Sequence, residues 1–306
     1  MIYTLTLNPA IDYVIGLDVL RKDDINRTLL EEIYFGGKGI NVSLILNELK
    51  VPSTALGFVA GFTGDAIEKD LETKGIVTDF IHVAHGNSRI NVKIRTMPDG
   101  KTTQAETQLN GAGPEIDGRS LRLLIDQLER IRKGDYIVLA GSIPPGVPRD
   151  IYELIAEKLS PRGVKIVVDA TGDVLKSVLK YKPFLAKPNK TELGDFFGVT
   201  INNADEAELY ARKLQEMGAR NALISMGTEG AIFVDEEGRR YDQDTLQGQI
   251  VNTVGAGDSL TAGFLAGLES DDIEYALRLA CAAGTATAFS PGLGDARKIR
   301  EIVRQF

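Results

Sequence analysis

The residues best suited to chemistry lie in one glycine-rich segment, residues 251–264, which reads VNTVGAGDSLTAGF. Gly255, Ala256 and Gly257 form a flexible turn, and an apolar helix is predicted to begin near Asp258. Backbone N–H groups of such a turn and of a helix N-terminus converge on one point and bind an anion there. A carboxylate at that point makes sense if Asp258 accepts the proton of a hydroxyl while the N–H groups stabilise a phosphoryl group in transfer. The alternative is that Asp258 is only a helix cap, for which aspartate is a favoured residue.

A second glycine cluster, residues 35–43 (FGGKGINVS), also leads into a predicted helix. Its three glycines, Gly37 among them, let a ligand approach the backbone, while Lys38 supplies a cation and Asn41 both a donor and an acceptor. These residues predict a phosphate or polyol site, or else a glycine-rich turn with a solvated lysine. The cluster is not a Walker A loop, which needs GxxxxGK[ST], and the chain has no GxGxxG dinucleotide fingerprint.

Two further segments carry polar groups at predicted element ends. In residues 187–193 (KPNKTEL), Asn189 and Glu192 are three apart at a helix start, so they share a face and could hold a hydrated magnesium ion. The same spacing is typical of a capping box, which is the better interpretation on spacing alone. Residues 225–230 (SMGTEG) follow a predicted strand and either place backbone groups near nucleotide phosphates or form a hairpin turn.

The elements that position these segments are predicted from apolar periodicity. Short apolar runs indicate buried parallel strands, and amphipathic segments that end near a glycine indicate the helices between them. This alternation predicts an α/β fold, a doubly wound parallel sheet with a Rossmann-like core. The strand segments are residues 136–140, 165–169 and 222–225, and the helical segments are residues 119–132, 149–160 and 204–217.

Two stretches depart from this alternation. In residues 90–108, Ile90, Val92 and Ile94 alternate with polar residues, a Pro98-Asp99-Gly100 turn follows, and the return from residue 101 to 108 is polar. This pattern predicts an antiparallel hairpin. Residues 11–35 are similarly strand-like. We therefore expect one domain, residues 1–306, with a small inserted β-sheet built from about 11–35 and 88–110 that serves as a lid or a subunit interface.

Composition limits the class of protein. Lysine and arginine number 35 against 43 aspartate and glutamate, a net charge of −8, which disfavours a nucleic-acid partner. The single cysteine, Cys281, excludes an intrachain disulfide and a cysteine zinc site and fits a reducing compartment. No apolar stretch approaches the roughly 18 residues that span a bilayer. We expect a cytoplasmic protein that binds neither nucleic acid nor membrane.

Taken together and in this order, the four segments resemble the ribokinase-like carbohydrate kinases, also called the phosphofructokinase B family. GGKGINVS resembles the first family signature, NTVGAGDSLTAGF the second, KPNKTE the N-x-x-E metal motif and SMGTEG the nucleotide loop. The resemblance extends over essentially the whole chain, from TLNPAID at residues 6–12 to the last helix. It implies a ribokinase-like fold and magnesium-dependent transfer of the ATP γ-phosphoryl group to a ketohexose monophosphate.

Within the family, TLNPAIDY, the lysine of GGKGIN and LAGSIPPG at residues 139–146 are most similar to members that convert fructose 1-phosphate to fructose 1,6-bisphosphate. Members that phosphorylate tagatose 6-phosphate are the alternative within the class. From other classes, a non-catalytic sugar-phosphate sensor or a Rossmann-type dehydrogenase would share the core. The retained Asp258, Asn189 and Glu192 argue against a sensor, because binding alone needs neither a base nor a metal group.

The resemblance also implies roles for individual residues. Asp258 becomes the general base, and Gly255, Ala256 and Gly257 become the anion hole. The sugar phosphate is assigned to Asp12, Arg27, the Gly37 backbone, Lys38, Asn41, Arg89, Asn91 and Ser142. ATP is assigned to Lys187, Asn189, Ser225, Met226, Gly227, Thr228, Glu229, Gly230, Gly257 and the region around Ser290. Magnesium is assigned to Glu192, mainly through water, and Asn189.

Family members often bind potassium beside the anion hole, which here implies Asn252, Val254 and carbonyls near Ser290–Gly294. Asn252 stands where the family often has aspartate, and Leu260 stands where it often has phenylalanine. The first departure removes a charge beside the implied potassium site. A homodimer that pairs lid strands is the expected assembly.

Overall fold

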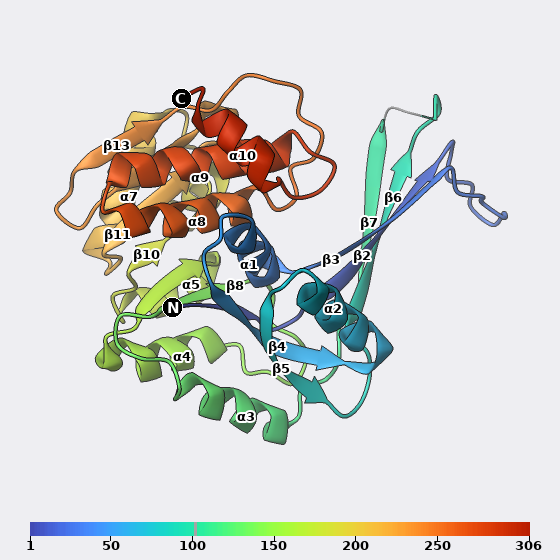
Figure 1. The fold of residues 1–306 in the computed structure, drawn as a ribbon, viewed down its shortest axis with the longest axis horizontal. Helices are drawn as coiled ribbons and strands as arrows, with labels where there is room; N and C mark the ends of the chain where they lie inside the picture. Colours follow the sequence, from blue (N-terminus) through green and yellow to red (C-terminus); the bar gives the residue numbers. More distant parts are fainter. Residues whose placement is uncertain (101–102) are drawn as a thin grey trace.

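The computed structural model describes residues 1–100 and 103–306, which form two sheets and the helices around the larger one (Figure 1). The larger sheet has nine strands in the order β13-β12-β11-β10-β9-β8-β1-β4-β5 within the described residues. From β11 to β5 all neighbours are parallel, while β12 and β13 pair antiparallel at one edge. The strands are β1 (Ile2–Thr6), β4 (Ser53–Ala60), β5 (Val77–Val83), β8 (Tyr136–Ala140), β9 (Lys165–Asp169), β10 (Leu185–Ala186), β11 (Asn221–Ser225), β12 (Ala231–Val234) and β13 (Arg240–Gln243).

Helices cover both faces of this sheet, which confirms the predicted doubly wound α/β fold. Neighbouring strand residues serve different cores: Val167 packs with α8 and α9, and Val168 packs with the helices of the opposite face. Because both faces are buried, the strands are almost continuously apolar. One face carries α1 (Lys38–Glu48), α2 (Gly61–Thr73), α8 (Ala256–Gly267), α9 (Ile273–Ala288) and α10 (Ala296–Val303); the other carries α3 (Gly118–Leu128), α4 (Ile151–Leu159), α5 (Gly172–Leu179), α6 (Lys190–Phe197) and α7 (Ala204–Glu216).

The smaller sheet contains the two segments that we predicted to form a lid, a name we keep for this sheet, and it projects from the core as long strands (Figure 1). Its order is β3-β2-β6-β7, from β2 (Ala10–Leu17), β3 (Leu30–Gly36), β6 (Arg89–Thr96) and β7 (Ala105–Asn110). The antiparallel pairing of β6 with β7 confirms the predicted hairpin, of which residues 101 and 102 lie outside the described residues. The pairing of β2 with β6 is parallel, so the two excursions join into one sheet.

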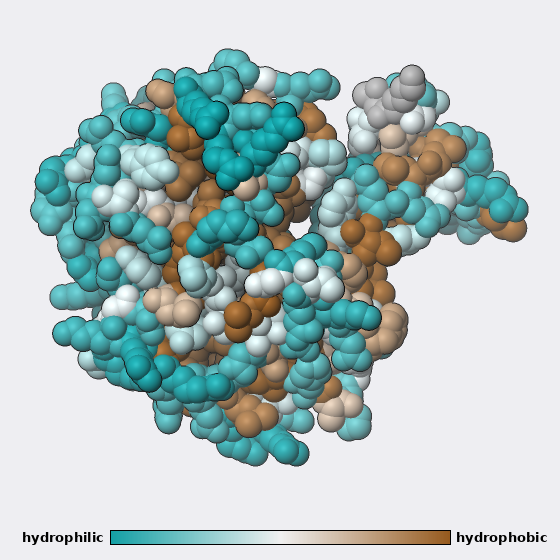
Figure 2. All heavy atoms as spheres, in the orientation of Figure 1, coloured by the Kyte–Doolittle hydropathy of each residue, from teal (hydrophilic) through white to brown (hydrophobic). Residues whose placement is uncertain are grey.

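The two faces of the lid differ in polarity because side chains alternate along a strand. Asp12 lies opposite Asn91 in the register, so both belong to one polar face that lines the cavity described below. The other face is apolar, and Ile33, Ile90 and Leu109 are 56%, 42% and 57% exposed there. Figure 2 shows hydrophobic atoms on the projecting lid. Among the described residues, no helix is both long enough and apolar enough to cross a membrane.

Candidate active site

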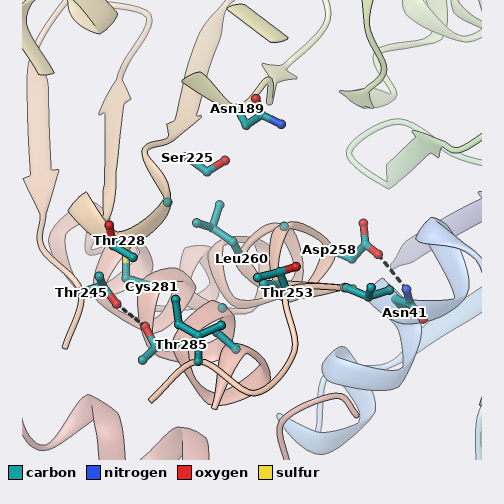
Figure 3. A pocket seen from close by; sticks show the side chains of 18 of the residues that line it. Asn41, Asn189, Ser225, Thr228, Thr245, Thr253, Asp258, Leu260, Cys281 and Thr285 are labelled. Carbon is teal, nitrogen blue, oxygen red and sulfur yellow. Dashed lines mark hydrogen bonds between the residues drawn. The ribbon is translucent and has the colours of Figure 1, made fainter. Parts of the chain in front are cut away.

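A cavity of about 800 Å³ lies where the carboxyl ends of β9 and β11, the base of the lid and the start of α8 meet (Figure 3). Ligands of open α/β sheets bind at this edge. Most of the residues predicted from the sequence line it: Asp12, Gly37, Lys38, Asn41, Arg89, Asn91, Lys187, Asn189, Glu192, Ser225, Met226, Gly227, Thr228, Gly230, Gly255, Ala256, Gly257 and Asp258.

Three predicted residues lie elsewhere in this chain. Arg27 is exposed between β2 and β3, and Ser142 is exposed after β8. Glu229 is exposed on the SMGTEG loop itself, where it pairs with Lys190 at 2.6 Å. None of the three lines the cavity, so their assigned contacts remain predictions from the family resemblance.

Asp258 occupies the first turn of α8 and is not its cap. Gly255 holds the N-cap position in the left-handed region, with φ 81°, a conformation that favours glycine. The side chain of Asp258 is buried, and its Oδ2 accepts a hydrogen bond of 2.7 Å from the amide of Asn41 on α1 (Figure 3). The capping alternative for Asp258 is therefore wrong, and the carboxylate is held toward the cavity by the second glycine cluster.

The surroundings of Asp258 make it a better base than an exposed aspartate. Burial raises its pKa to about 6, and the negative charge of Asp169 adds to the rise, whereas the Asn41 hydrogen bond, Lys187 and Lys38 oppose it. A carboxylate with this pKa is ionised at neutral pH and holds a proton more firmly than an unperturbed one. It can accept a proton from a hydroxyl in the cavity.

Asp169 is a buried carboxylate that the sequence analysis placed only in a strand. It ends β9, and its Oδ1 accepts from Lys38 Nζ at 3.0 Å while its Oδ2 pairs with Lys187 Nζ at 3.2 Å. Burial alone would raise the pKa of Asp169, but Lys187 and Lys38 hold it below its ordinary value. An aspartate that closes an apolar strand at the ligand-binding edge of the sheet was the signal that could have identified it.

The side of the cavity that the family resemblance assigns to the sugar is built on the polar face of the lid. Asp12 accepts from Asn91 Nδ2 at 2.8 Å and from Lys93 Nζ at 2.7 Å. Within the described residues, Asn91 Oδ1 is buried without a partner, which suits it to accept a hydrogen bond from a ligand hydroxyl. Arg89 donates from Nε to the carbonyl of Asn8 at 3.1 Å and also lines the cavity. Lys93 was missed because a lysine in an alternating strand resembles an ordinary surface residue.

The predicted metal residues form a capping box at the start of α6, which confirms the interpretation that their spacing favoured. Glu192 N donates to Asn189 Oδ1 and Asn189 N donates to Glu192 Oε2, both at 2.8 Å. The cap uses one carboxylate oxygen, and Glu192 Oε1 has no hydrogen bond in the part of the chain that the structure describes. No group of three histidine, cysteine, aspartate or glutamate side chains there is placed to hold a metal. The residues therefore fit a magnesium ion bound mainly by phosphate oxygens and water, with Glu192 facing its water shell.

The side of the cavity that the family resemblance assigns to the nucleotide continues past the SMGTEG loop. Gly227–Glu229 form a short 3₁₀ turn between β11 and β12, so the segment is also a hairpin turn. Beyond it, Thr245 and Thr285 share a hydrogen bond of 2.5 Å, and Cys281 and Leu260 complete a mainly small-residue wall (Figure 3). The sequence analysis did not select these wall residues, because they come from loop and helix positions with no motif.

The segments implied for potassium already contain a cation from the chain itself. Asn252 Oδ1 accepts from Val254 N at 3.0 Å, which engages the side chain locally. Lys298 of α10 donates from Nζ to the carbonyl of Phe289 and, at 3.0 Å, to Ser290 Oγ. Asn252 is neutral, and the Lys298 ammonium places a positive charge at Ser290, so both reduce the attraction of this loop for a monovalent cation.

A buried carboxylate of raised pKa, the start of α8 and two lysines meet at the edge of a doubly wound sheet, an arrangement suited to phosphoryl transfer. Residues 5–300 match the family model described as "pfkB family carbohydrate kinase". The chain is similar to the 1-phosphofructokinase of Bacillus subtilis, with 42% identity over 304 residues that cover 99% of this chain and 97% of that protein. The chain belongs to the pfkB family of carbohydrate kinases.

Other relatives agree with this assignment. The D-tagatose-1-phosphate kinase of Bacillus licheniformis is 38% identical over 307 residues, covering 100% of this chain and 98% of that protein. The structure of phosphofructokinase-2 from Escherichia coli in complex with substrates and products has a TM-score of 0.91 and 25% identity, covering 99% and 98% of the two chains. That enzyme is also known in complex with potassium and as a tetrameric inhibited form.

Proposed function

We propose that this carbohydrate kinase transfers the γ-phosphoryl group of ATP to the 6-hydroxyl of D-fructose 1-phosphate, giving fructose 1,6-bisphosphate and ADP. The observation that carries the proposal is the buried Asp258, with a pKa raised to about 6, at the anion-binding start of α8. Relatives named 1-phosphofructokinase and D-tagatose-1-phosphate kinase support a ketohexose that already bears its phosphate at carbon 1. The tagatose 6-phosphate alternative has its phosphate at the opposite end of the sugar.

In the proposed reaction, the oxygen of the 6-hydroxyl bonds to the γ-phosphorus while Asp258 accepts the hydroxyl proton. The bond from that phosphorus to the β–γ bridging oxygen breaks, and ADP leaves with the electron pair. Backbone N–H groups of the turn from Gly255 to Gly257 stabilise the charge on the transferring group. Asp12 and Asn91 orient the sugar hydroxyls. Magnesium, when bound, would neutralise charge on the ATP phosphates, with Asn189 and Glu192 facing it.

We also propose a homodimer through the lids and a cytoplasmic location. The exposed apolar residues Ile33, Ile90 and Leu109 share one lid face, and a second copy would cover them by the same contacts in both directions. The lone buried Cys281 fits a reducing compartment. An acidic chain with charge −8 supports neither nucleic acid nor an anionic membrane as a partner.

A coupled assay of ADP formation tests the substrate. The panel is fructose 1-phosphate, D-tagatose 1-phosphate, fructose 6-phosphate, tagatose 6-phosphate and free fructose, each at matched magnesium and ATP. The proposal expects the highest kcat/KM for fructose 1-phosphate and turnover of D-tagatose 1-phosphate below it. A preference for either 6-phosphate would overturn it. Binding of fructose 1-phosphate with no turnover of any sugar would favour the non-catalytic sensor.

A further inference from the structure

Asp169 lies at the meeting point of the elements that bind the two substrates. It is 2% exposed at the end of β9, and each of its oxygens has its own ammonium partner. Lys38 is the first residue of α1, on the sugar side, and Lys187 follows β10, on the nucleotide side. The Asp169 carboxylate therefore joins two lysines, Lys38 and Lys187, that are 149 positions apart in the sequence. The sequence motifs include both lysines but not the carboxylate that joins them.

The two lysines reach the region where the phosphoryl group would be transferred. Lys187 Nζ lies 3.4 Å from the position that a Cβ on Gly257 would take, so it stands against the anion-binding turn. Lys38 is electrostatically coupled to Asp258 and Glu192 as well as to Asp169. Its side chain is 40% exposed to the cavity, whereas that of Lys187 is 4% exposed. Lys187 is thus fixed, and Lys38 is able to contact a ligand.

We propose that Asp169 is a positioning residue for phosphoryl transfer: it holds Lys38 and Lys187 beside the reacting groups and keeps both ammonium groups from pairing with Asp258. The inference rests on the proposed function and adds a residue to it. Both lysines already act electrostatically on Asp258, so without Asp169 this carboxylate is left as a partner for them. An ion pair there would weaken the base by favouring its ionised form.

The charges around Asp258 make this role measurable. The charged groups that face it are Asp169, Lys187 and Lys38. The negative charge of Asp169 raises the pKa of Asp258, and the two lysines lower it. Replacing Asp169 with asparagine removes the negative charge and frees the lysines, so both effects move the pKa of Asp258 downward. A residue that only supported the fold would change activity without this directed shift.

The experiment compares the wild-type protein with Asp169→Asn, and uses Asp235→Asn as a matched control. Asp235 is also a buried carboxylate at the end of a strand, and it pairs with Arg239 at 2.6 Å away from the cavity. We expect Asp169→Asn to lower kcat by about 10²-fold, the loss typical of misplaced catalytic groups. The acid limb of its kcat/KM profile should move to lower pH, and the Asp235→Asn profile should match the wild type.

A ligand-free measurement separates this inference from the proposed substrate. Titration of the ¹³C carboxyl signal of Asp258, assigned by its loss in Asp258→Asn, reports its pKa without any turnover. The pKa of Asp258 should fall in Asp169→Asn. It should rise in Lys38→Met, because that change removes a cation that lowers it, and this second test is valid even if Asp169→Asn does not fold. If the pKa does not move in these directions, or if Asp169→Asn keeps wild-type kcat, the inference is wrong. A wild-type protein inactive on fructose 1-phosphate would instead refute the proposed function.

Discussion

Replacement of Asp258 by asparagine should abolish turnover and at the same time stabilise the fold. The ordinary pKa of 3.8 is raised to about 6 in the folded protein, mainly by burial. This difference corresponds to about 3 kcal/mol, since each pKa unit is about 1.36 kcal/mol. The ionised carboxylate therefore lowers the free energy of unfolding by about this amount at neutral pH.

The sign of the pH dependence follows from the direction of that shift. The pKa of Asp258 is higher in the folded than in the unfolded protein. The destabilisation of the fold by its ionised carboxylate is therefore absent below about pH 4 and fully present above about pH 6. Asp258→Asn removes the charge at every pH. The free energy of unfolding should thus rise by about 3 kcal/mol at pH 8, and the difference should disappear as the pH falls to 4.

In contrast to the stability of the fold, the kcat of Asp258→Asn should fall. Loss of a general base costs at least 10²–10⁴-fold in kcat, while the affinity for sugar phosphate and ATP should remain close to that of the wild type. The acid limb that we expect near pH 6 in the wild-type kcat/KM profile reports the base of the free enzyme, and it should be missing from the residual activity of the variant.

The assay pairs urea unfolding at fixed protein concentration with ADP formation, both from pH 4 to pH 8. Asp235→Asn is the control, and its free energy of unfolding should change in the opposite direction. Burial alone would raise the pKa of Asp235, but Arg239 holds it below its ordinary value, so this variant should lose stability above pH 4 and keep its turnover. Full activity of Asp258→Asn, or a stability gain that is equal at pH 4 and pH 8, would refute the reasoning.

The other predictions concern the metal, the loop cation and the lid. Glu192→Gln keeps the capping box, which tolerates glutamine, but should raise the magnesium concentration for half-maximal rate by about 10–100-fold; an unchanged requirement removes Glu192 from the metal shell. The wild-type kcat should be equal in sodium and potassium. Lys298→Met should lower kcat about tenfold, which corresponds to the loss of a charged hydrogen bond, and potassium but not sodium should restore part of it. Activation of the wild type by potassium would contradict this. Sedimentation should show a dimer that Ile33→Glu converts to monomers, whereas Gln108→Glu on the other lid face should not; a monomeric wild type overturns the assembly.

The parts of the site that the sequence predicted are those set by local backbone requirements. Gly37 and Gly255 both have positive φ, and each precedes a helix start where N–H groups are free. A short motif records such geometry because the residues that create it are neighbours in the chain. The doubly wound core was predicted for a similar reason, since burial on both faces of a parallel sheet leaves continuous apolar runs.

Contacts between distant segments left no comparable signal. Asp169 and Lys38 are 131 positions apart, and Lys93 and Asp12 are 81 apart, so no spacing pattern links them. The Asp12–Lys93 pair depends on the register of β2 with β6, and the Lys38–Asp169 pair depends on where α1 begins relative to the end of β9. Only the folded chain specifies these placements. The capping question at Asp258 was open for the same reason, because the sequence does not say which residue of the turn holds the N-cap position.

The charge balance of the site changes one expectation about the cleft. An acidic protein that binds phosphates needs local cations, and the family resemblance assigns Lys38, Arg27 and Arg89 to the sugar phosphate and Lys187 to ATP. In the structure the two lysines face two carboxylates, Asp169 and Asp258, so this centre is close to neutral before any substrate binds. Attraction for the phosphates must come from the helix N-termini, from Arg89 and from a metal that arrives with ATP. A centre with balanced charge also keeps Asp258 free to accept a proton, because a strongly positive cleft would lower its pKa toward that of an ordinary aspartate.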